Sequence, residues 1–166
     1  MRGEDELTRA PGACAPKFAT GTTDLVEARR LLEAENLAFV LVRRGSVIAR
    51  GTSGGVDELL AAVDELGARA RGASLADKVV GKAVALIVVS AGICAVDTPL
   101  ASDAAVQVLK SHNIALRAAS IVPQIMNRRG DAACPLEQLT RPFDEPGAAI
   151  AKLREFISRR RENPAV

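Results

Sequence analysis

A nearly continuous apolar run from Val79 to Ile93 constrains the fold more than any other feature of this chain. The run is about 15 residues long and includes Lys82, whereas a membrane-spanning helix needs roughly 20 apolar residues. We therefore expect a helix in the interior of a domain. The segment that opens it, Ala76 to Lys82, carries three charges and a glycine. Charged residues at the start of a buried helix indicate a ligand site.

The composition is that of one ordinary globular domain. The chain has 166 residues, of which 48% are hydrophobic and 25% are charged, which is enough for a single core. The net charge is only +2, and the chain has no Trp or Tyr. Nucleic-acid-binding proteins use basic patches and stacking aromatic rings, so we expect no nucleic-acid partner. We expect no membrane partner either.

The cysteines predict a cytoplasmic protein. Cys14, Cys94 and Cys134 are widely spaced and form no CxxC pair, which is more typical of a reducing compartment than of a disulfide framework. The N-terminus lacks the apolar stretch of a secretory signal. The three scattered cysteines and the single histidine, His112, have no zinc-ligand spacing. We therefore expect no metal and no cofactor.

Hydrophobic periodicity and turn residues predict the order α-β-β-α-α-β-α-β-α. A hairpin with its turn at Arg44-Gly45 precedes strands that alternate with helices, so we expect an α/β fold with a mixed sheet covered on both faces. Asp24 is expected to cap the first helix. The domain is predicted over residues 22–161, between an N-terminal extension (1–21) and a tail (162–166). The predicted helices are 24–36, 56–66, 76–91, 102–111 and 146–160, and the predicted strands are 37–42, 47–50, 94–98 and 114–118.

Asp77, Lys78 and Lys82 are the first candidate site residues. If all three lie on one helix, the two lysines share a face, and their ammonium groups repel each other unless an anion lies between them. The helix N-terminus would add free N–H donors, so the start of this helix suits a phosphate or a carboxylate as ligand. In the alternative interpretation, Ser74 and Asp77 have the spacing of a capping box, so Asp77 only caps the helix. Both lysine side chains then extend to water.

Two loops are further candidates. Gly54 and Gly55 precede a predicted helix and could present N–H groups to an anion, although Gly-Gly before a helix is often only a bend. Asn127 and Arg128 close a polar turn, where either residue could bind a polar ligand or merely stabilise the turn.

Cys134 and Glu137 open another short helix, with proline at its first position. A thiol at a helix N-terminus has a lowered pKa and could act as a nucleophile, but most free cysteines are buried and inert. His112 falls at a predicted helix C-terminus, where it complements the helix dipole rather than acting as a base.

Several of these segments together resemble one uncharacterised prokaryotic family, the domain of unknown function DUF1893, whose fold is cytidine-deaminase-like. The resemblance covers about residues 23–157. Its segments are Ala76–Ala83, Asn127–Gly130 and Cys134–Glu137, with weaker likeness at Leu41–Gly45 and Gly54–Val56.

The resemblance implies a three-layer α/β/α domain. It places Asp77 and Lys78 near the position where deaminases carry His-x-Glu, and Pro99–Asp103 at the position of their Pro-Cys-x-x-Cys. The cysteine ligands are absent from Pro99–Asp103. Deaminase chemistry needs a zinc-activated water, so we expect a zinc-free version of this fold without deaminase activity.

The leading hypothesis is a small-molecule-binding domain for a nucleotide or another anionic metabolite. The first alternative is a metal-independent enzyme with Lys78 or Cys134 as nucleophile and Asp77 or Glu137 as proton carrier. The second is an interaction or assembly module. A homodimer is suggested only by analogy with deaminase-like folds. The candidate ligand-binding residues are Asp77, Lys78, Lys82, Gly54, Gly55, Asn127, Cys134 and Glu137.

Overall fold

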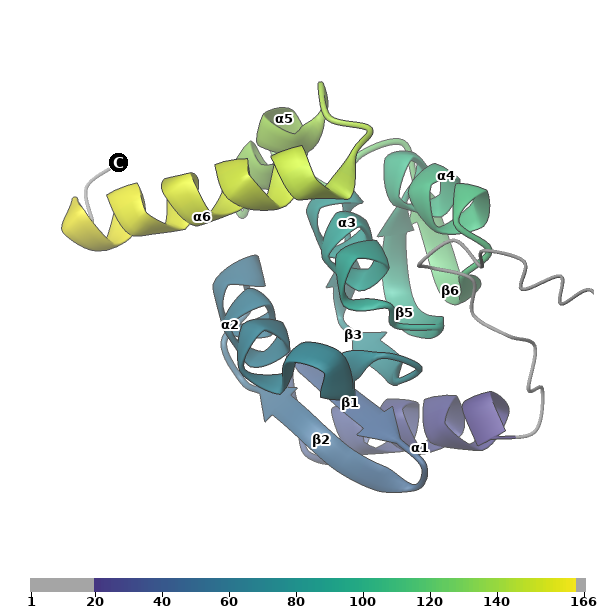
Figure 1. Cartoon of the computed structure of the whole chain (residues 1–166). Coiled ribbons are helices and arrows are strands. Elements are labelled where there is room, and N and C mark those ends of the chain that lie inside the picture. The colour runs from purple at the N-terminus through teal and green to yellow at the C-terminus, as the bar shows by residue number, and fades with distance from the viewer. Residues whose placement is uncertain (1–19, 164–166) are drawn as a thin grey trace, which may run out of the picture.

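The computed structural model of the protein describes residues 20–163, with side chains from Thr23 onward. Seven segments are helical, one of them a 3-10 helix (η1), and six are strands (Figure 1). In chain order these elements are α1 (Thr20–Ala34), β1 (Phe39–Arg43), β2 (Ser46–Gly51), α2 (Val56–Leu66), η1 (Gly67–Ala70), β3 (Ser74–Asp77), β4 (Val79–Val80), α3 (Lys82–Ala91), β5 (Ala95–Ser102), α4 (Asp103–Ser111), β6 (Ala115–Val122), α5 (Pro135–Thr140) and α6 (Pro146–Glu162).

The strands form one mixed sheet. β1 pairs antiparallel with β2 and with β3, whereas β3, β4 and β6 all pair parallel with β5. Because β6 occupies one edge of β5 over nearly its whole length, β3 and β4 must share the other edge. They therefore act as one strand position that is interrupted at Lys78.

Helices cover both faces of this sheet. Val40, Val42 and Ala76 pack against α1 on one face. On the other face, Phe39 and Leu75 belong to the larger core with buried residues of α2, α3, α4 and α6. Figure 1 shows α6 crossing over α3, with its C-terminal end extending beyond the body of the domain. The expected three-layer α/β/α architecture with a mixed sheet is confirmed.

The buried helix begins later than expected. Residues 74–77 and 79–80 are strands, and α3 begins only at Lys82, with Gly81 as its N-cap. The prediction of one helix over 76–91 was therefore wrong in its first turns, as was the capping role given to Asp77 there. Short apolar runs do not distinguish a buried strand from a buried helix. From Val84 to Val88 the helix is buried on all sides, as its composition predicts.

Asp24 also differs from its prediction. The helix that contains it begins at Thr20, so Asp24 lies inside α1 rather than at its N-cap. Its two carboxylate oxygens accept hydrogen bonds from the backbone N–H groups of Arg44 and Gly45, at 2.7 and 2.8 Å. A helix side chain thus holds the β1–β2 turn, at the position where the sequence predicted a hairpin.

Other predictions can be compared directly with the structure. Ser102 caps α4 by accepting a hydrogen bond from the N–H of Ala105, as expected. Cys94 is disulfide-bonded, contrary to the expectation of reduced cysteines, whereas Cys134 is a free thiol. Most of the predicted N-terminal extension lies outside the described residues, although α1 includes its last two positions. None of the helices among the described residues is both long and apolar enough to cross a membrane.

Candidate functional site

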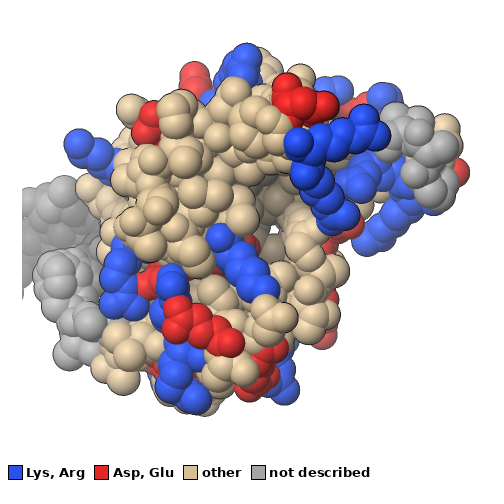
Figure 2. Space-filling model, turned by 180° about the vertical axis from the view of Figure 1, so that it is seen from behind, with Lys and Arg blue, Asp and Glu red and all other residues tan. Residues whose placement is uncertain are grey.

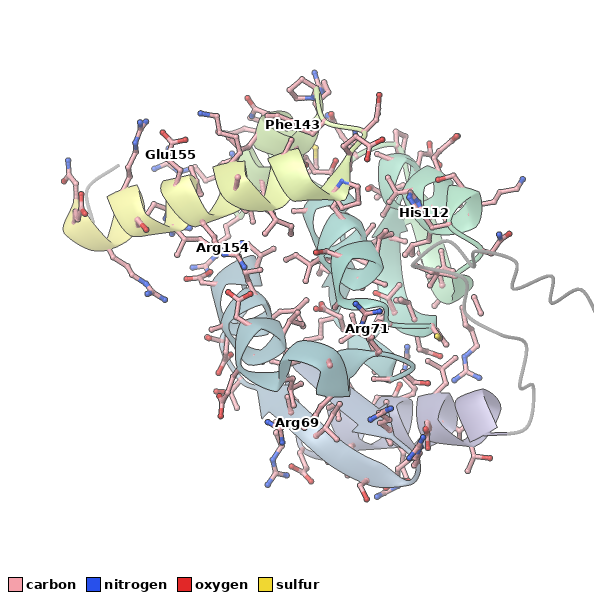
Figure 3. The ribbon with its side chains drawn as sticks, in the orientation of Figure 1. Arg69, Arg71, His112, Phe143, Arg154 and Glu155 are labelled. Carbon is pink, nitrogen blue, oxygen red and sulfur yellow. The ribbon has the colours of Figure 1, made fainter. Side chains whose placement is uncertain are left out.

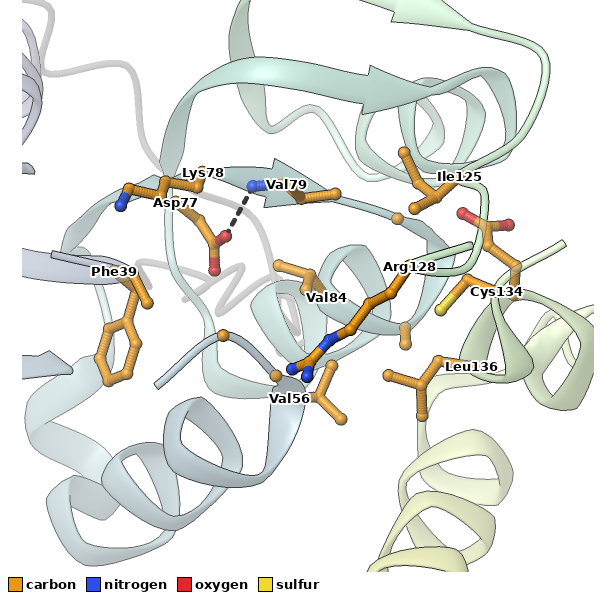
Figure 4. A pocket seen from close by; sticks show the side chains of 16 residues that line it. Phe39, Val56, Asp77, Lys78, Val79, Val84, Ile125, Arg128, Cys134 and Leu136 are labelled. Atoms are coloured by element: carbon orange, nitrogen blue, oxygen red, sulfur yellow. Dashed lines mark hydrogen bonds between the residues drawn. The ribbon is translucent and has the colours of Figure 1, made fainter. Parts of the chain in front are cut away.

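A pocket of about 340 Å³ opens at the end of β3, where the chain leaves the sheet. Its walls come from the starts of β1, α2, α3 and α5, from the strand break, and from the loop after β6 (Figure 4). Apolar side chains supply most of the lining, which is typical of small-molecule sites. The lining residues are Ala38, Phe39, Gly54, Gly55, Val56, Asp77, Lys78, Val79, Gly81, Ala83, Val84, Ile125, Arg128, Cys134, Leu136 and Glu137.

Six of the eight candidate residues line this pocket, although they come from three separate parts of the chain. They are Gly54, Gly55, Asp77, Lys78, Cys134 and Glu137. The other two, Lys82 and Asn127, do not line it.

Lys82 points away from the pocket. Its Nζ donates a hydrogen bond to the carbonyl of Arg141 at 2.9 Å and lies 3.6 Å from the carboxylate of Asp144. These partners belong to the connection between α5 and α6. Lys82 therefore anchors that connection, and the expected pair of lysines around an anion does not form.

Asn127 organises its own turn. Its Oδ1 accepts hydrogen bonds from the N–H groups of Arg129 and Asp131, and its Nδ2 donates to the Asp131 carboxylate at 2.7 Å. This is the turn-stabilising alternative. The neighbouring Arg128 lines the pocket instead.

Lys78 contributes its backbone and stem rather than its charge. Its Nζ donates a hydrogen bond to the side-chain oxygen of Asn36 at 2.6 Å, at the end of α1. In Figure 4 the amine lies to the left of Asp77, away from Arg128 and Cys134. This position does not suit a nucleophile for a ligand in the pocket.

Asp77 faces the pocket from the break between β3 and β4. Its Oδ1 accepts a hydrogen bond from the N–H of Val79 at 2.9 Å, drawn as a dashed line in Figure 4. Removal from water raises the pKa of Asp77 to about 7, and the single hydrogen bond from Val79 only partly opposes that increase. At neutral pH this carboxyl group can either donate or accept a proton.

Glu137 closes the opposite wall of the pocket. It is only 7% exposed, and its Oε1 accepts a hydrogen bond from the N–H of Lys82 at 3.1 Å. Gly81 leaves the room for this contact, because a Cβ at that position would lie 2.6 Å from Oε1. A carboxylate from α5 therefore occupies the N-terminus of α3, which was the predicted anion-binding position.

Arg128 lines the pocket, although its neighbour Asn127 was the residue of this turn expected to bind the ligand. Figure 4 shows its guanidinium extending into the pocket from the loop after β6. No hydrogen bond or ion pair joins this guanidinium to any of the described residues. Figure 2 shows the molecule from behind, where the surface is hollowed near its middle and Lys and Arg side chains flank the hollow.

The remaining lining groups have simpler roles. Gly55 is the N-cap of α2 and has a φ of 156°, a conformation that favours glycine. Cys134 is the N-cap of α5, but its side chain makes no capping hydrogen bond. The apolar wall, including Phe39 and Leu136, could not be read from motifs, because each of its members also fits an ordinary core position.

The pocket lining includes neither the histidine nor a group of metal-ligating side chains. His112 does not line it; the residue follows α4, and its ring lies 2.9 Å from the carbonyl of Val108 (Figure 3). Within the described part of the chain, no group of three or more His, Cys, Asp or Glu residues could hold a metal ion.

Solved structures are similar to this chain to different extents. A DUF1893 family protein (TM1506) from Thermotoga maritima superposes with a TM-score of 0.74 at 19% identity, covering 95% of this chain and 99% of the other. A dCMP deaminase from a cyanophage, in complex with dCMP and dUMP, gives a TM-score of 0.43 at 12% identity over 64% of this chain and 99% of its own. A diaminohydroxyphosphoribosylaminopyrimidine deaminase/reductase from Thermotoga maritima gives 0.42 at 16% identity, over 73% and 41%.

At the level of sequence, no functionally curated protein matches the chain. The family model named TM1506, a domain of unknown function (DUF1893), matches residues 27–157. That span includes all the strands and the entire pocket lining. The chain therefore belongs to the DUF1893 family.

Proposed function

We propose that this protein binds a small molecule carrying an acid group, in the pocket at the end of β3. The observation that carries the proposal is the guanidinium of Arg128, which extends into a mostly apolar cavity without a carboxylate partner among the described residues. A guanidinium forms strong paired hydrogen bonds with carboxylates and phosphates. An apolar body on the ligand would fill the space beside Phe39, Val56 and Leu136.

The positive group that faces the pocket is the guanidinium of Arg128 rather than the expected pair of lysines. The ligand class is therefore kept, while the group that would bind it has changed. A nucleotide remains one member of that class.

A second candidate function is proton transfer to a bound substrate. The observation in its favour is Asp77, whose pKa of about 7 is the value that suits a general acid or base at neutral pH. Cys134 is the remaining nucleophile candidate in the pocket, since the amine of Lys78 is bound to Asn36. This function would also use the pocket, so ligand binding is tested first.

The test compares two adjacent arginines. Arg128→Gln removes the charge from the pocket, whereas Arg129→Gln removes the same charge from the next residue, which does not line it. Calorimetry with a panel of monocarboxylates, dicarboxylates and phosphate monoesters should reveal a binder, and mass spectrometry of the extract from fresh protein should reveal any ligand that co-purifies. We expect Arg128→Gln to weaken binding at least about tenfold and Arg129→Gln to leave it unchanged.

Two outcomes would overturn the proposal. In one, no acid on the panel or in the extract binds the folded protein. In the other, the Arg128 and Arg129 variants bind equally well. Either outcome would favour the interaction or assembly module.

A cytoplasmic location and a homodimer are also kept as proposals. The free thiol of Cys134 supports the first, although the disulfide at Cys94 is unusual for that compartment. Cell fractionation tests the location, and light scattering on the purified protein tests the oligomeric state.

A further inference from the structure

The charges that line the pocket do not suit a purely anionic ligand. One guanidinium, from Arg128, faces two carboxyl groups, from Asp77 and Glu137. The only other cation in the lining, Lys78, has its amine bound to Asn36 outside the cavity. The thiol of Cys134 completes the titratable groups of the lining. An anion alone would satisfy Arg128 while adding another negative charge beside two carboxyl groups.

Both carboxyl groups keep an oxygen for the ligand. Oδ1 of Asp77 accepts from Val79, and Oε1 of Glu137 accepts from Lys82, but the second oxygen of each has no partner among the described residues. Every fully buried side-chain oxygen of those residues does have a partner. The two remaining oxygens must therefore be accessible, and both side chains line the pocket.

From this arrangement we infer that the ligand is a zwitterion of the apolar α-amino acid class, with its carboxylate at Arg128 and its ammonium group at Asp77. The inference rests on the proposed function and specifies its ligand. Figure 4 shows Arg128 and Asp77 entering the cavity from opposite walls. Asp77 is favoured over Glu137 as the ammonium partner because Glu137 already caps α3. The apolar side chain would contact Val56, Ile125 and Leu136.

The experiment uses matched probes on the full-length chain. The twenty standard α-amino acids are screened first by thermal shift and then by calorimetry. For the tightest binder, the N-acetyl derivative lacks the ammonium charge and keeps the carboxylate, and the decarboxylated amine does the reverse. We expect each derivative to bind at least about tenfold more weakly than the parent amino acid.

Asp77→Asn provides an independent measurement. Asparagine keeps an oxygen that can accept from Val79, so the fold should be retained while the charge partner is lost. We expect amino-acid affinity to fall at least about tenfold in this variant and to be unchanged in Arg129→Gln. In the natural protein, affinity should rise between pH 5.5 and 8, because Asp77 must lose its proton to pair with an ammonium group.

The outcomes separate this inference from the proposed function. If the N-acetyl derivative binds as well as the parent and Arg128→Gln still weakens it, the pocket binds acids but does not recognise an amine, and the inference is wrong. If no amino acid binds, the inference is also wrong, and the acid panel decides the proposed function. If amino acids bind the Arg128→Gln variant as tightly as the natural protein, both the inference and the proposed function are wrong.

Discussion

The carboxylate of Glu137 accepts a hydrogen bond from the backbone N–H of Lys82, so the start of α5 caps the start of α3. The two residues are 55 positions apart in the sequence. The first N–H groups of a helix have no partner within the helix, and a buried end without an acceptor destabilises the fold. This contact therefore connects the C-terminal part of the chain to the central helix of the core.

Glu137→Ala should lower the free energy of unfolding by about 1–2 kcal/mol, because it removes the cap from a buried helix end. Glu137→Gln keeps an acceptor oxygen at the same place and should lose less than half as much. Urea denaturation at pH 7 measures both. Glu65→Ala, on the exposed side of α2, is the control and should lie within about 0.5 kcal/mol of the natural protein. Equal losses for the alanine and glutamine variants would contradict the capping role.

Gly81→Ala tests the same contact from the other side. The φ of Gly81 is −91°, which alanine tolerates, so any effect comes from the new Cβ, which would lie 2.6 Å from Oε1 of Glu137. We expect a loss of about 1 kcal/mol. The stability lost through Gly81→Ala should be smaller in the Glu137→Ala background than in the natural protein. A double-mutant cycle measures this difference.

The matched control is Gly54→Ala. It also adds a Cβ to a glycine of the pocket, but that atom would have no neighbour within 4 Å. We expect this variant to be neutral or slightly stabilised. If both alanine variants lose equal stability, steric contact with Glu137 is not the cause.

Asp77 should make stability depend on pH. Its pKa of about 7 in the folded protein exceeds the ordinary value of 3.8 for an aspartate in water, so between those pH values the folded state holds a proton that the unfolded state releases. The contribution of this group to stability therefore decreases as the pH rises from about 4 to about 7. Asp77→Asn removes that penalty and should be more stable than the natural protein by roughly 1–3 kcal/mol at pH 8.

Denaturation curves at pH 5 and pH 8 check this prediction. The advantage of the asparagine variant should be clearly smaller at pH 5, where the natural Asp77 is protonated. A variant that is less stable at both pH values would show that the carboxyl group is not penalised by burial.

Asp97 should be the most sensitive charged residue of the sheet. It is 1% exposed, and its two oxygens accept hydrogen bonds from Arg29 on α1, at 2.8 Å, and from Arg117 on β6. Asp97→Ala leaves both guanidinium groups without this partner and should cost about 2–3 kcal/mol, whereas Arg117→Ala, at a half-exposed residue, should cost less than about 1 kcal/mol. Equal effects in thermal denaturation would contradict the central role of Asp97.

The sequence predicted most elements of the fold, because their signals are local. The turn at Arg44-Gly45, the cap at Ser102 and the helix from Val56 to Leu66 each depend on residues a few positions apart. The start of α3 was misplaced because Ser74–Asp77 is short and apolar enough to fit either a strand or a helix.

Most of the predicted candidate residues come together at one pocket, but the charges that face it were predicted less well. Asp77, Cys134 and Glu137 were selected as candidates, and all three line the pocket. Lys82 and Asn127 were selected for their chemistry, but contacts with Arg141 and Asp131 direct them elsewhere. Side-chain direction depends on tertiary partners, which the spacing of residues along the chain does not reveal.

The link between Glu137 and Lys82 also bears on how a molecule could enter. Moving α5 away from α3 would leave the N–H of Lys82 without an acceptor, at a penalty of about 1–3 kcal/mol. Arg128, on the loop after β6, is exposed and has no hydrogen bond to any described side chain, so it can rotate without such a penalty. Entry is therefore easiest past Arg128. The gate would be a single long side chain, and both helices could stay in place while the ligand passes.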